Sequence, residues 1–106
     1  MIGRLWHGWT KPEDAAAFEG TLLAEVLPGI HRIDGYRGSF LLRRDQPSRV
    51  EFVTLTLWES LDAVRAFAGE DYEAAVLHDD AKIFLSAWDE RSVHYEVKLE
   101  PADTAL

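Results

Sequence analysis

The sequence predicts an α+β fold with the element order β-α-β-β-α-β, the ferredoxin-like arrangement in which two helices cover one face of a four-stranded antiparallel sheet. Two observations support this prediction. Apolar and β-branched segments alternate with segments of helical periodicity, in that order along the chain. In addition, the segment 49–58 carries bulky apolar residues on both faces, which is typical of a strand that is covered on both sides.

Composition places the chain among small globular proteins. Its 106 residues suit one domain, expected over residues 1–100 and followed by a flexible tail at 101–106. The absence of cysteine excludes disulfides, thiolate metal sites and cysteine nucleophiles; together with the lack of a signal-peptide pattern, it suggests a cytoplasmic location. A net charge of −8 disfavours nucleic acid, and no apolar run approaches the roughly 20 residues of a membrane span.

The N-terminal part of the chain predicts a strand followed by a helix. Residues 2–9 have the apolar and aromatic bias of a strand. Thr10 and Glu13 have the spacing of a capping box, and Pro12 suits the first helical turn. The helix is expected to end near Pro28. Its apolar stripe consists of Ala15, Phe18, Leu22 and Val26.

The central part predicts two strands and a second helix. Residues 36–44 and 49–58 have strand composition, and the intervening DQPS is a turn. Ser60 is a candidate N-cap for the following helix, because a serine side chain can accept a hydrogen bond from the first helical turn. The apolar periodicity of this helix is broken at Gly69.

The C-terminal part is expected to complete the helix and the sheet. Residues 71–78 restart the helical pattern, and residues 81–88 suggest a short helical continuation. In residues 93–99 apolar and polar side chains alternate strictly, which predicts a strand with one apolar and one polar face.

The two-faced strand at 49–58 also predicts the assembly. Two helices can cover only one face of the sheet, and the chain has no third layer for the other face. A second copy of the chain is the simplest cover. We therefore expect a homodimer that packs through the open sheet face around a two-fold axis.

Four pieces of the sequence resemble the antibiotic biosynthesis monooxygenase (ABM) domain superfamily. They are RLWHGWT, VTLTLWES, VRAFAGEDYEAAV and VHYEV, and the block TLWESLDAVRAFAGEDYEAAV is the most specific part. The resemblance covers about residues 2–99 and implies a dimeric α+β barrel. Some members are cofactor-independent monooxygenases of polyketide phenols, others bind and degrade haem, and many have no established activity. Function therefore has to be argued from the site itself.

Two histidines are candidates for a catalytic base. His7 lies among aromatic residues, where a histidine can accept a proton near neutral pH or can be a hydrogen-bonded core or interface residue. His78 ends the second predicted helix. The resemblance implies that a haem-degrading relative places its iron ligand on this helix, about one residue away. The other interpretation of His78 is a solvated helix end, where a cationic side chain meets the negative pole of the dipole.

Three aromatic residues are candidate substrate-binding residues. The resemblance implies that Trp58, in a W-x-S context, corresponds to a tryptophan that lies over the haem, so Trp58 walls a pocket or packs the core. Tyr72 faces the same cavity or packs its helix. Strand alternation places His7 and Trp9 on one face and Trp6 on the other. If Trp6 faces the helices, His7 belongs to the dimer interface.

The remaining basic side chains have simpler interpretations. Arg4, Arg37 and Arg43 can pair with the many carboxylates or receive an acidic substrate, and surface pairing is the simpler account. His31 in a loop and His94 on the polar face of the last strand are given no role.

These observations lead to two main hypotheses. The first is a cofactor-independent monooxygenase that acts on a small apolar, aromatic or polyketide-type molecule in a pocket between sheet and helices, with no cofactor and no metal. The second is a non-catalytic dimeric protein that binds a small molecule or is associated with stress. A third possibility is haem binding. However, the haem-degrading branch carries an asparagine on its first strand, and this chain contains no asparagine.

Overall fold

A computed structural model describes residues 1–101, with the side chains of residues 25–27 excepted. Within these residues five strands form one antiparallel sheet in the order β2-β3-β1-β4, and β5 also pairs with β1. The strands are β1 (Ile2–Thr10), β2 (Tyr36–Asp45), β3 (Val50–Trp58), β4 (Leu85–Trp88) and β5 (Val93–Glu96). This order confirms the ferredoxin-like arrangement, because β1 and β3 are central and the β2–β3 hairpin forms one edge.

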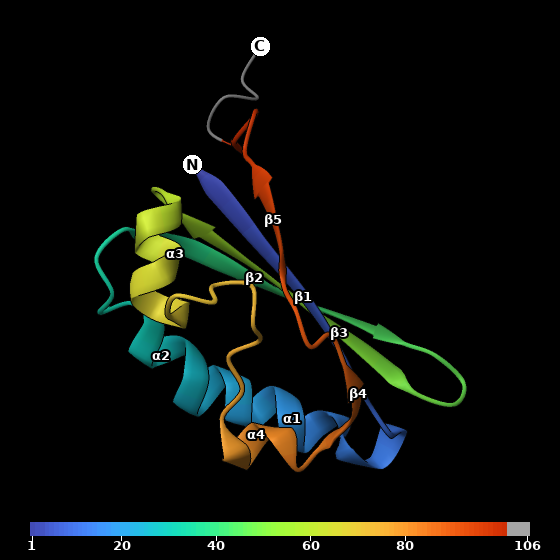
Figure 1. The fold of residues 1–106 in the computed structure, drawn as a ribbon. Coiled ribbons are helices and arrows are strands. Elements are labelled where there is room, and N and C mark those ends of the chain that lie inside the picture. Colours follow the sequence, from blue (N-terminus) through green and yellow to red (C-terminus); the bar gives the residue numbers. More distant parts are fainter. Residues whose placement is uncertain (102–106) are drawn as a thin grey trace.

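The helical segments lie on one side of the sheet (Figure 1). The first run comprises η1 (Pro12–Asp14), α1 (Ala15–Thr21), the π-helical η2 (Leu22–Val26) and α2 (Leu27–Ile30). The others are α3 (Leu61–Ala68) and α4 (Asp79–Lys82). None of the helices in the described part of the chain combines the length and apolarity needed to cross a membrane.

The expected helix signals are confirmed in part. The stripe residues Ala15, Phe18 and Leu22 are buried, whereas the side chain of Val26 and the tail residues 102–106 lie outside the described residues. Ser60 accepts a hydrogen bond from the Ala63 N–H at 3.2 Å, as predicted for an N-cap.

The capping box proposed for Thr10 and Glu13 is wrong. Thr10 remains part of β1, and its hydroxyl donates to the carbonyl oxygen of Lys11 at 2.9 Å. Lys11 stands at the N-cap of η1 and makes no side-chain cap bond. Tertiary pairing explains this outcome, because Thr10 is fully buried opposite Val50 of β3 and cannot turn toward the helix.

The helix expected at 71–78 is also wrong. These residues form a turn and an extended segment that pairs through a bridge between Ala74 and Arg91. The N–H of Ala75 donates to the Glu90 carbonyl at 2.9 Å, so this segment finds its backbone partners in the 89–92 loop. The 3–4 spacing of its apolar residues therefore does not reflect a helix.

The last position in the sheet is divided between two strands. Residues Leu85–Trp88, expected to be helical, form β4 and pair with the end of β1, while β5 pairs with its beginning. Four expected strands thus become five. The strand expected at 93–99 is shorter, and its apolar residues Val93 and Tyr95 are exposed on the face away from the helices.

The register determines which side chains face the helices. Arg4 pairs with Thr56, and Trp6 pairs with Thr54. These residues are at least partly buried beneath the helical layer, whereas the alternate residues of β1 face the other side. The core forms two clusters: one around Phe18 and Phe52, the other around Trp58, Val64 and Ile30.

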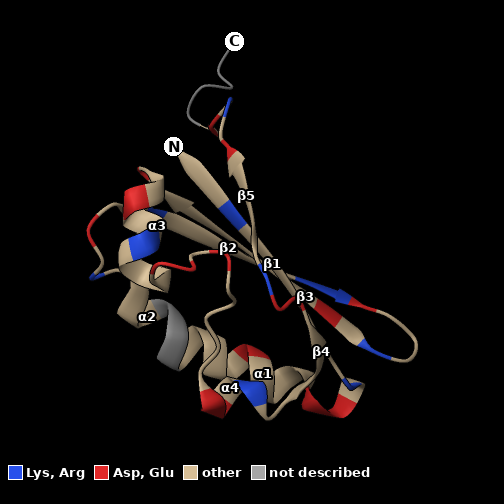
Figure 2. Cartoon of the chain, viewed as in Figure 1, with Lys and Arg blue, Asp and Glu red and all other residues tan. Residues whose placement is uncertain are grey.

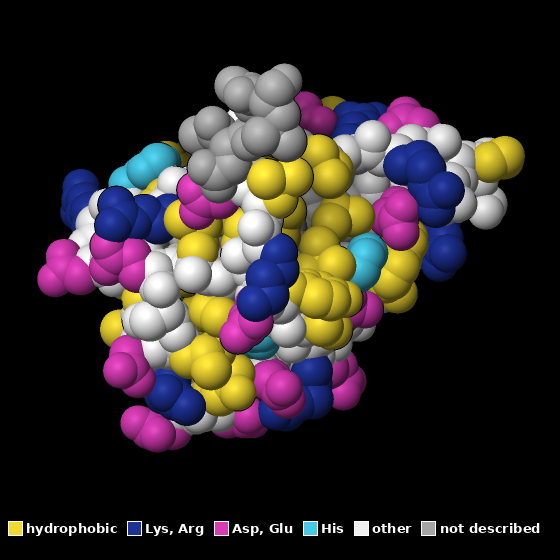
Figure 3. Space-filling model, turned by 90° about the horizontal axis from the view of Figure 1, so that it is seen from above, with side chains coloured by type: hydrophobic (Ala, Val, Ile, Leu, Met, Phe, Trp, Pro, Cys, Tyr) yellow, Lys and Arg dark blue, Asp and Glu magenta, His cyan; other side chains and the backbone are white. Residues whose placement is uncertain are grey.

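The other face of the sheet carries exposed hydrophobic side chains. Exposed fractions are 47% for Phe40, 51% for Leu42, 48% for Val93 and 54% for Tyr95. Figure 3, which views the molecule from above, shows hydrophobic side chains gathered across the visible surface with histidine among them. Charged residues concentrate instead on the helices, the loops and the end of the β2–β3 hairpin (Figure 2).

Candidate functional site

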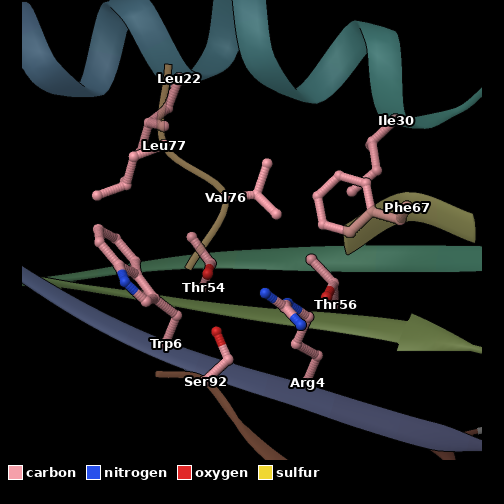
Figure 4. Close-up of a pocket in the computed structure, with 10 residues that line it drawn as sticks. All are labelled: Arg4, Trp6, Leu22, Ile30, Thr54, Thr56, Phe67, Val76, Leu77 and Ser92. Atoms are coloured by element: carbon pink, nitrogen blue, oxygen red, sulfur yellow. The ribbon is translucent and has the colours of Figure 1, made fainter. Parts of the chain in front are cut away.

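A small cavity of about 70 Å³ lies between the sheet and the helical layer. Its walls combine apolar and aromatic side chains with a few inward polar groups (Figure 4). The lining residues are Arg4, Trp6, Leu22, Ile30, Thr54, Thr56, Phe67, Val76, Leu77 and Ser92. An apolar cavity with few convergent polar groups is the usual form of a small-molecule site.

Arg4 is the only charged residue of β1 and lies in the cavity wall. Its side chain is 5% exposed. Nη2 donates to the Ala74 carbonyl at 2.9 Å, and Nη1 donates to the Tyr72 carbonyl. In Figure 4 the guanidinium rises from the strand toward Phe67, whose ring centre lies 5.7 Å from Cζ.

Burial disfavours the charge on Arg4. Desolvation lowers the pKa of this guanidinium from its usual range to about 10, so it remains cationic at neutral pH. Within the described residues Arg4 forms no ion pair, although the chain contains 19 Asp and Glu residues. The cavity wall therefore holds a positive charge that no carboxylate of the described residues balances.

His94 lies beside Arg4. The two residues are paired in the register between β5 and β1, and Nε2 of His94 is 3.1 Å from Nη1 of Arg4. Burial, and then the charge of Arg4, lower the pKa of His94 below its usual 6.5. A neutral imidazole whose Nε2 accepts a hydrogen bond from Arg4 agrees with both the short contact and the lowered pKa. Nδ1 of His94 is buried and has no hydrogen-bond partner in the part of the chain that the structure describes.

Hydroxyl groups complete the polar part of the cavity. Thr56 accepts a hydrogen bond from Nε1 of Trp58 at 2.8 Å. Ser92, at the entrance to β5, is 3% exposed, and its hydroxyl has no partner among the described residues. A buried hydroxyl without a partner is unfavourable, and such exceptions call for an explanation.

Trp6 forms the aromatic end of the cavity (Figure 4). Its Nε1 donates to the Asp89 carbonyl at 2.8 Å. The indole also lies over Gly8: a Cβ atom at that position would be 2.4 Å from the ring. The glycine in RLWHGWT therefore provides the space for the tryptophan that precedes it.

Two of the predicted site residues lie next to the cavity without lining it. Trp58 is fully buried; it stacks on Phe67 with ring centres 5.0 Å apart and donates to Thr56. It thus supports two lining residues from behind. Tyr72 supplies the carbonyl that accepts from Arg4, and its ring meets His94 edge-on at 5.1 Å.

His7 and Trp9 lie on the opposite face of the sheet from this cavity. Nδ1 of His7 is 2.7 Å from a carboxylate oxygen of Asp89, and the rings of His7 and Trp9 stack with centres 6.1 Å apart. Nε1 of Trp9 is buried and finds no hydrogen-bond partner among residues 1–101 as far as they are described. Because Trp6 faces the helices, strand alternation directs both residues to the open face.

His78 is exposed and stands at the N-cap of α4, so it is not among the lining residues. The expectation that it terminates a helix is wrong, because no helix precedes it. The surface pairing expected for Arg37 and Arg43 is confirmed: they pair with Glu59 and with Asp45, respectively.

On sequence grounds Ser92 is not a candidate, His94 has no role, and Arg4 is mainly a surface residue. For Arg4, a signal was available: it shares the alternation of Trp6, and both lie opposite threonines of the two-faced strand. For Ser92 and His94 there is none, because their burial depends on the extended 72–78 segment, and the apolar spacing of 71–78 predicts a helix there.

The chain has a fold of the ferredoxin-like α+β class, with a small cavity between the sheet and the helices. The profile of the antibiotic biosynthesis monooxygenase family matches residues 1–79, and the chain belongs to this family. A comparison with curated proteins finds no significant match.

Several solved structures share the fold. A monooxygenase of Streptomyces coelicolor in complex with nanaomycin D is 16% identical, with a TM-score of 0.67 and coverage of 93% of this chain and 88% of that chain. SnoaB, a cofactor-independent oxygenase of Streptomyces nogalater, is 18% identical, with a TM-score of 0.63 and coverage of 94% and 96%. The haem degrader MhuD of Mycobacterium tuberculosis, with two haems in its active site, is 19% identical, with a TM-score of 0.62 and coverage of 94% and 98%.

Proposed function

We propose that the protein is a cofactor-independent monooxygenase that oxidises a small aromatic or polyketide-type phenol or enol in the cavity between sheet and helices. The observation that carries this proposal is the cavity itself, in which a desolvated cation and hydroxyl groups face aromatic and aliphatic walls. Membership of the family supports the same reaction class. Two similarly folded proteins are described as an oxygenase and a monooxygenase.

The reaction can proceed without a metal if the substrate is bound as its anion. The phenolate or enolate transfers one electron to O₂, and the resulting organic radical and superoxide combine to form a C–O bond. Protonation gives a hydroperoxide. Its carbon then loses its hydrogen, and the outer hydroxyl of the hydroperoxide leaves with this hydrogen as water, so that a carbonyl group remains. A phenol and O₂ thus become a quinone and water. The walls exclude water from the radical pair, and the cation stabilises the anion.

The cavity has to widen for a ring to enter. Its volume of about 70 Å³ is well below the 300 Å³ or more that is usual for ligand pockets. Val76 and Leu77 enclose it from a segment without regular secondary structure, and Val76 is 37% exposed. Movement of this segment is the simplest route of entry.

A non-catalytic binding protein is the second candidate, and one observation favours it. The lining residues include no histidine, aspartate or glutamate, so none can act as a conventional general base. Haem does not fit these residues. His78 is exposed outside the cavity, and the cavity is far smaller than a porphyrin requires.

The protein is further proposed to act as a homodimer through the open sheet face. Phe40 and Leu42 of β2 and Val93 and Tyr95 of β5 are about half exposed in the single chain. A second copy would cover them, and with them the His7–Asp89 pair. In this arrangement His7 and Trp9 belong to the interface.

Oxygen uptake and product mass across a panel of hydroxylated naphthalenes and anthrones would test the proposed activity. The variant Val76→Trp should fill the cavity and lower uptake at least tenfold, whereas Ile83→Trp is the matched control because Ile83 is 76% exposed. Tight binding of a phenol without oxygen uptake would support the non-catalytic alternative. Equal uptake by both variants would exclude this cavity as the reaction site.

A further inference from the structure

We propose that Arg4 and Ser92 form a subsite for an anionic oxygen, which holds the ionised phenol or enol group of the ligand and selects ligands that bind as anions. The oxidation that follows binding rests on the proposed function, whereas the binding of the anion by Arg4 and Ser92 does not depend on it. The subsite lies in the cavity wall, where both residues contribute polar atoms.

The first step of the argument is the charge of Arg4. The chain has 19 acidic and 11 basic Lys and Arg residues, so a carboxylate partner would be easy to supply. Arg37, Arg43, Arg44, Arg65 and Arg91 all have one. Arg4, which is far more deeply buried, is held by two carbonyl oxygens and His94. An unbalanced buried cation is unfavourable unless an anion arrives to balance it.

The second step is the remaining donor capacity of Arg4. A guanidinium has five N–H groups. Three are used in the contacts with Tyr72, Ala74 and His94. The two carbonyls hold the side chain in place without neutralising it, and two N–H groups have no partner among the described residues. Depression of the Arg4 pKa by burial is consistent with a cation that awaits an anion.

The third step is Ser92, which is an independent observation. Its hydroxyl is buried, belongs to a lining residue and has no partner among the described residues. Its backbone is fixed by a hydrogen bond from its N–H to the Glu73 carbonyl at 2.6 Å. Figure 4 shows the hydroxyl oxygen directed toward the interior beside Trp6 and Arg4. A ligand oxygen would satisfy this hydroxyl and the free N–H groups of Arg4 together.

The subsite defines a ligand class. The ring lies among Trp6, Phe67 and the aliphatic walls, and its ionised oxygen points toward Arg4 and Ser92. Because the cavity wall lacks a base, the anion must be favoured by binding rather than by proton transfer to a lining carboxylate or imidazole. The cation lowers the pKa of the bound phenol, and the proton leaves to solvent. A ring without an acidic oxygen is not expected to use the subsite.

Absorbance titration with 4-nitrophenol tests this inference, because its phenolate is coloured and its neutral form is not. The wild-type protein should bind it as the phenolate at a pH where most of the free probe is neutral. Ser92→Ala should weaken phenolate binding about threefold or more while unfolding at the same denaturant concentration, since it removes an unpartnered hydroxyl. Arg4→Gln should weaken binding at least tenfold. Arg44→Gln is the control, because Arg44 is exposed on β2.

Nitrobenzene, which has the same ring and no acidic oxygen, separates the subsite from the cavity. Its affinity should be equal for wild type and Ser92→Ala. Phenolate binding that is unchanged in both Arg4→Gln and Ser92→Ala would overturn the subsite, as would binding of the probe in its neutral form. Phenolate binding that depends on both residues, without oxygen uptake from any phenol, would refute the proposed oxygenase activity and leave the subsite intact.

Discussion

At the scale of single residues, the site depends on how β1 alternates. Arg4 and Trp6 face the helices, whereas His7 and Trp9 face the open side. Asp89 contacts both sides of the strand: its carbonyl accepts from Trp6, and its carboxylate accepts from the backbone N–H of His7. Trp6 and His7 thus share Asp89 as a hydrogen-bond partner, although their side chains lie on opposite faces of the sheet.

His94 should make stability depend on pH. Its pKa is lowered in the folded protein by burial and then by Arg4, while Glu73 acts in the opposite direction and the ring of Tyr72 covers one side. The unfolded chain therefore takes up this proton more readily. The contribution of neutral His94 to the free energy of unfolding is fully present above about pH 6.5 and is lost as the pH falls through the lowered pKa of the folded protein. His94→Gln should show a smaller loss of unfolding free energy between pH 7.5 and 5.5.

Chemical denaturation at several pH values measures this difference. The carboxylates with lowered pKa values, Asp45 and Asp71, titrate below this range and affect both proteins alike. Parallel curves of stability against pH for wild type and variant would contradict the role given to His94.

At the scale of secondary-structure elements, β1 is the element on which the site is built. It pairs with β3 along one edge and with β4 and β5 along the other. The row of Arg4, Thr56 and His94 therefore comes from three strands, while the 72–78 segment covers it from the helical side. The helical segments supply Leu22, Ile30 and Phe67 as apolar walls.

Gly8→Ala should disturb this element and close one end of the cavity. The new Cβ would lie 2.4 Å from the Trp6 ring and 3.0 Å from Leu85, so the indole must move out of its hydrogen bond with Asp89. We expect a loss of about 1–3 kcal/mol in unfolding free energy, as is usual for overpacking, and weaker ligand binding. Thermal unfolding and probe titration measure both effects.

Gly20→Ala is the matched control for this substitution. Gly20 lies in α1, and a Cβ atom there meets nothing within 4 Å. Alanine should therefore stabilise the helix by about 0.5–1 kcal/mol. If Gly8→Ala were as stable as Gly20→Ala, the indole could not be packed over Gly8 as described.

At the scale of the whole molecule, the unequal covering of the sheet is the main feature. One face is buried beneath helices, and the other exposes apolar side chains that lie opposite one another on β1, β2, β3 and β5. A patch of this kind on a small acidic protein supports the proposed dimer interface. A two-fold dimer would use the same patch twice.

Leu42→Glu should raise the dissociation constant of the dimer about tenfold or more, because it would bury an unpaired charge in the interface. Leu42 is 51% exposed on β2. Leu23→Glu is the control, since Leu23 is 53% exposed in the helical layer away from the sheet face. Sedimentation equilibrium measures the constant. A wild-type protein that stays at 12.0 kDa at millimolar concentration would refute the dimer.

The sequence by itself determined the fold class and the order of the elements up to α3. Strand composition and helical periodicity are local properties, and the two-faced apolar pattern of 49–58 identified a central strand before any pairing was known. The same local properties predict a helix at 71–78 that continues at 81–88, and this prediction is wrong because hydrophobic spacing does not report which backbone partners are available. It also identified the alternation of β1 without determining which face the helices cover.

Only the tertiary structure decided the site. The cation, the unpartnered hydroxyl and the imidazole beside them come from β1, the entrance to β5 and β5 itself, which the antiparallel register brings together across some 90 residues of chain. The desolvation that makes Arg4 and Ser92 candidates for binding arises from the extended segment above them. Burial and partner choice are properties of the packed chain, and no single stretch of sequence contains them.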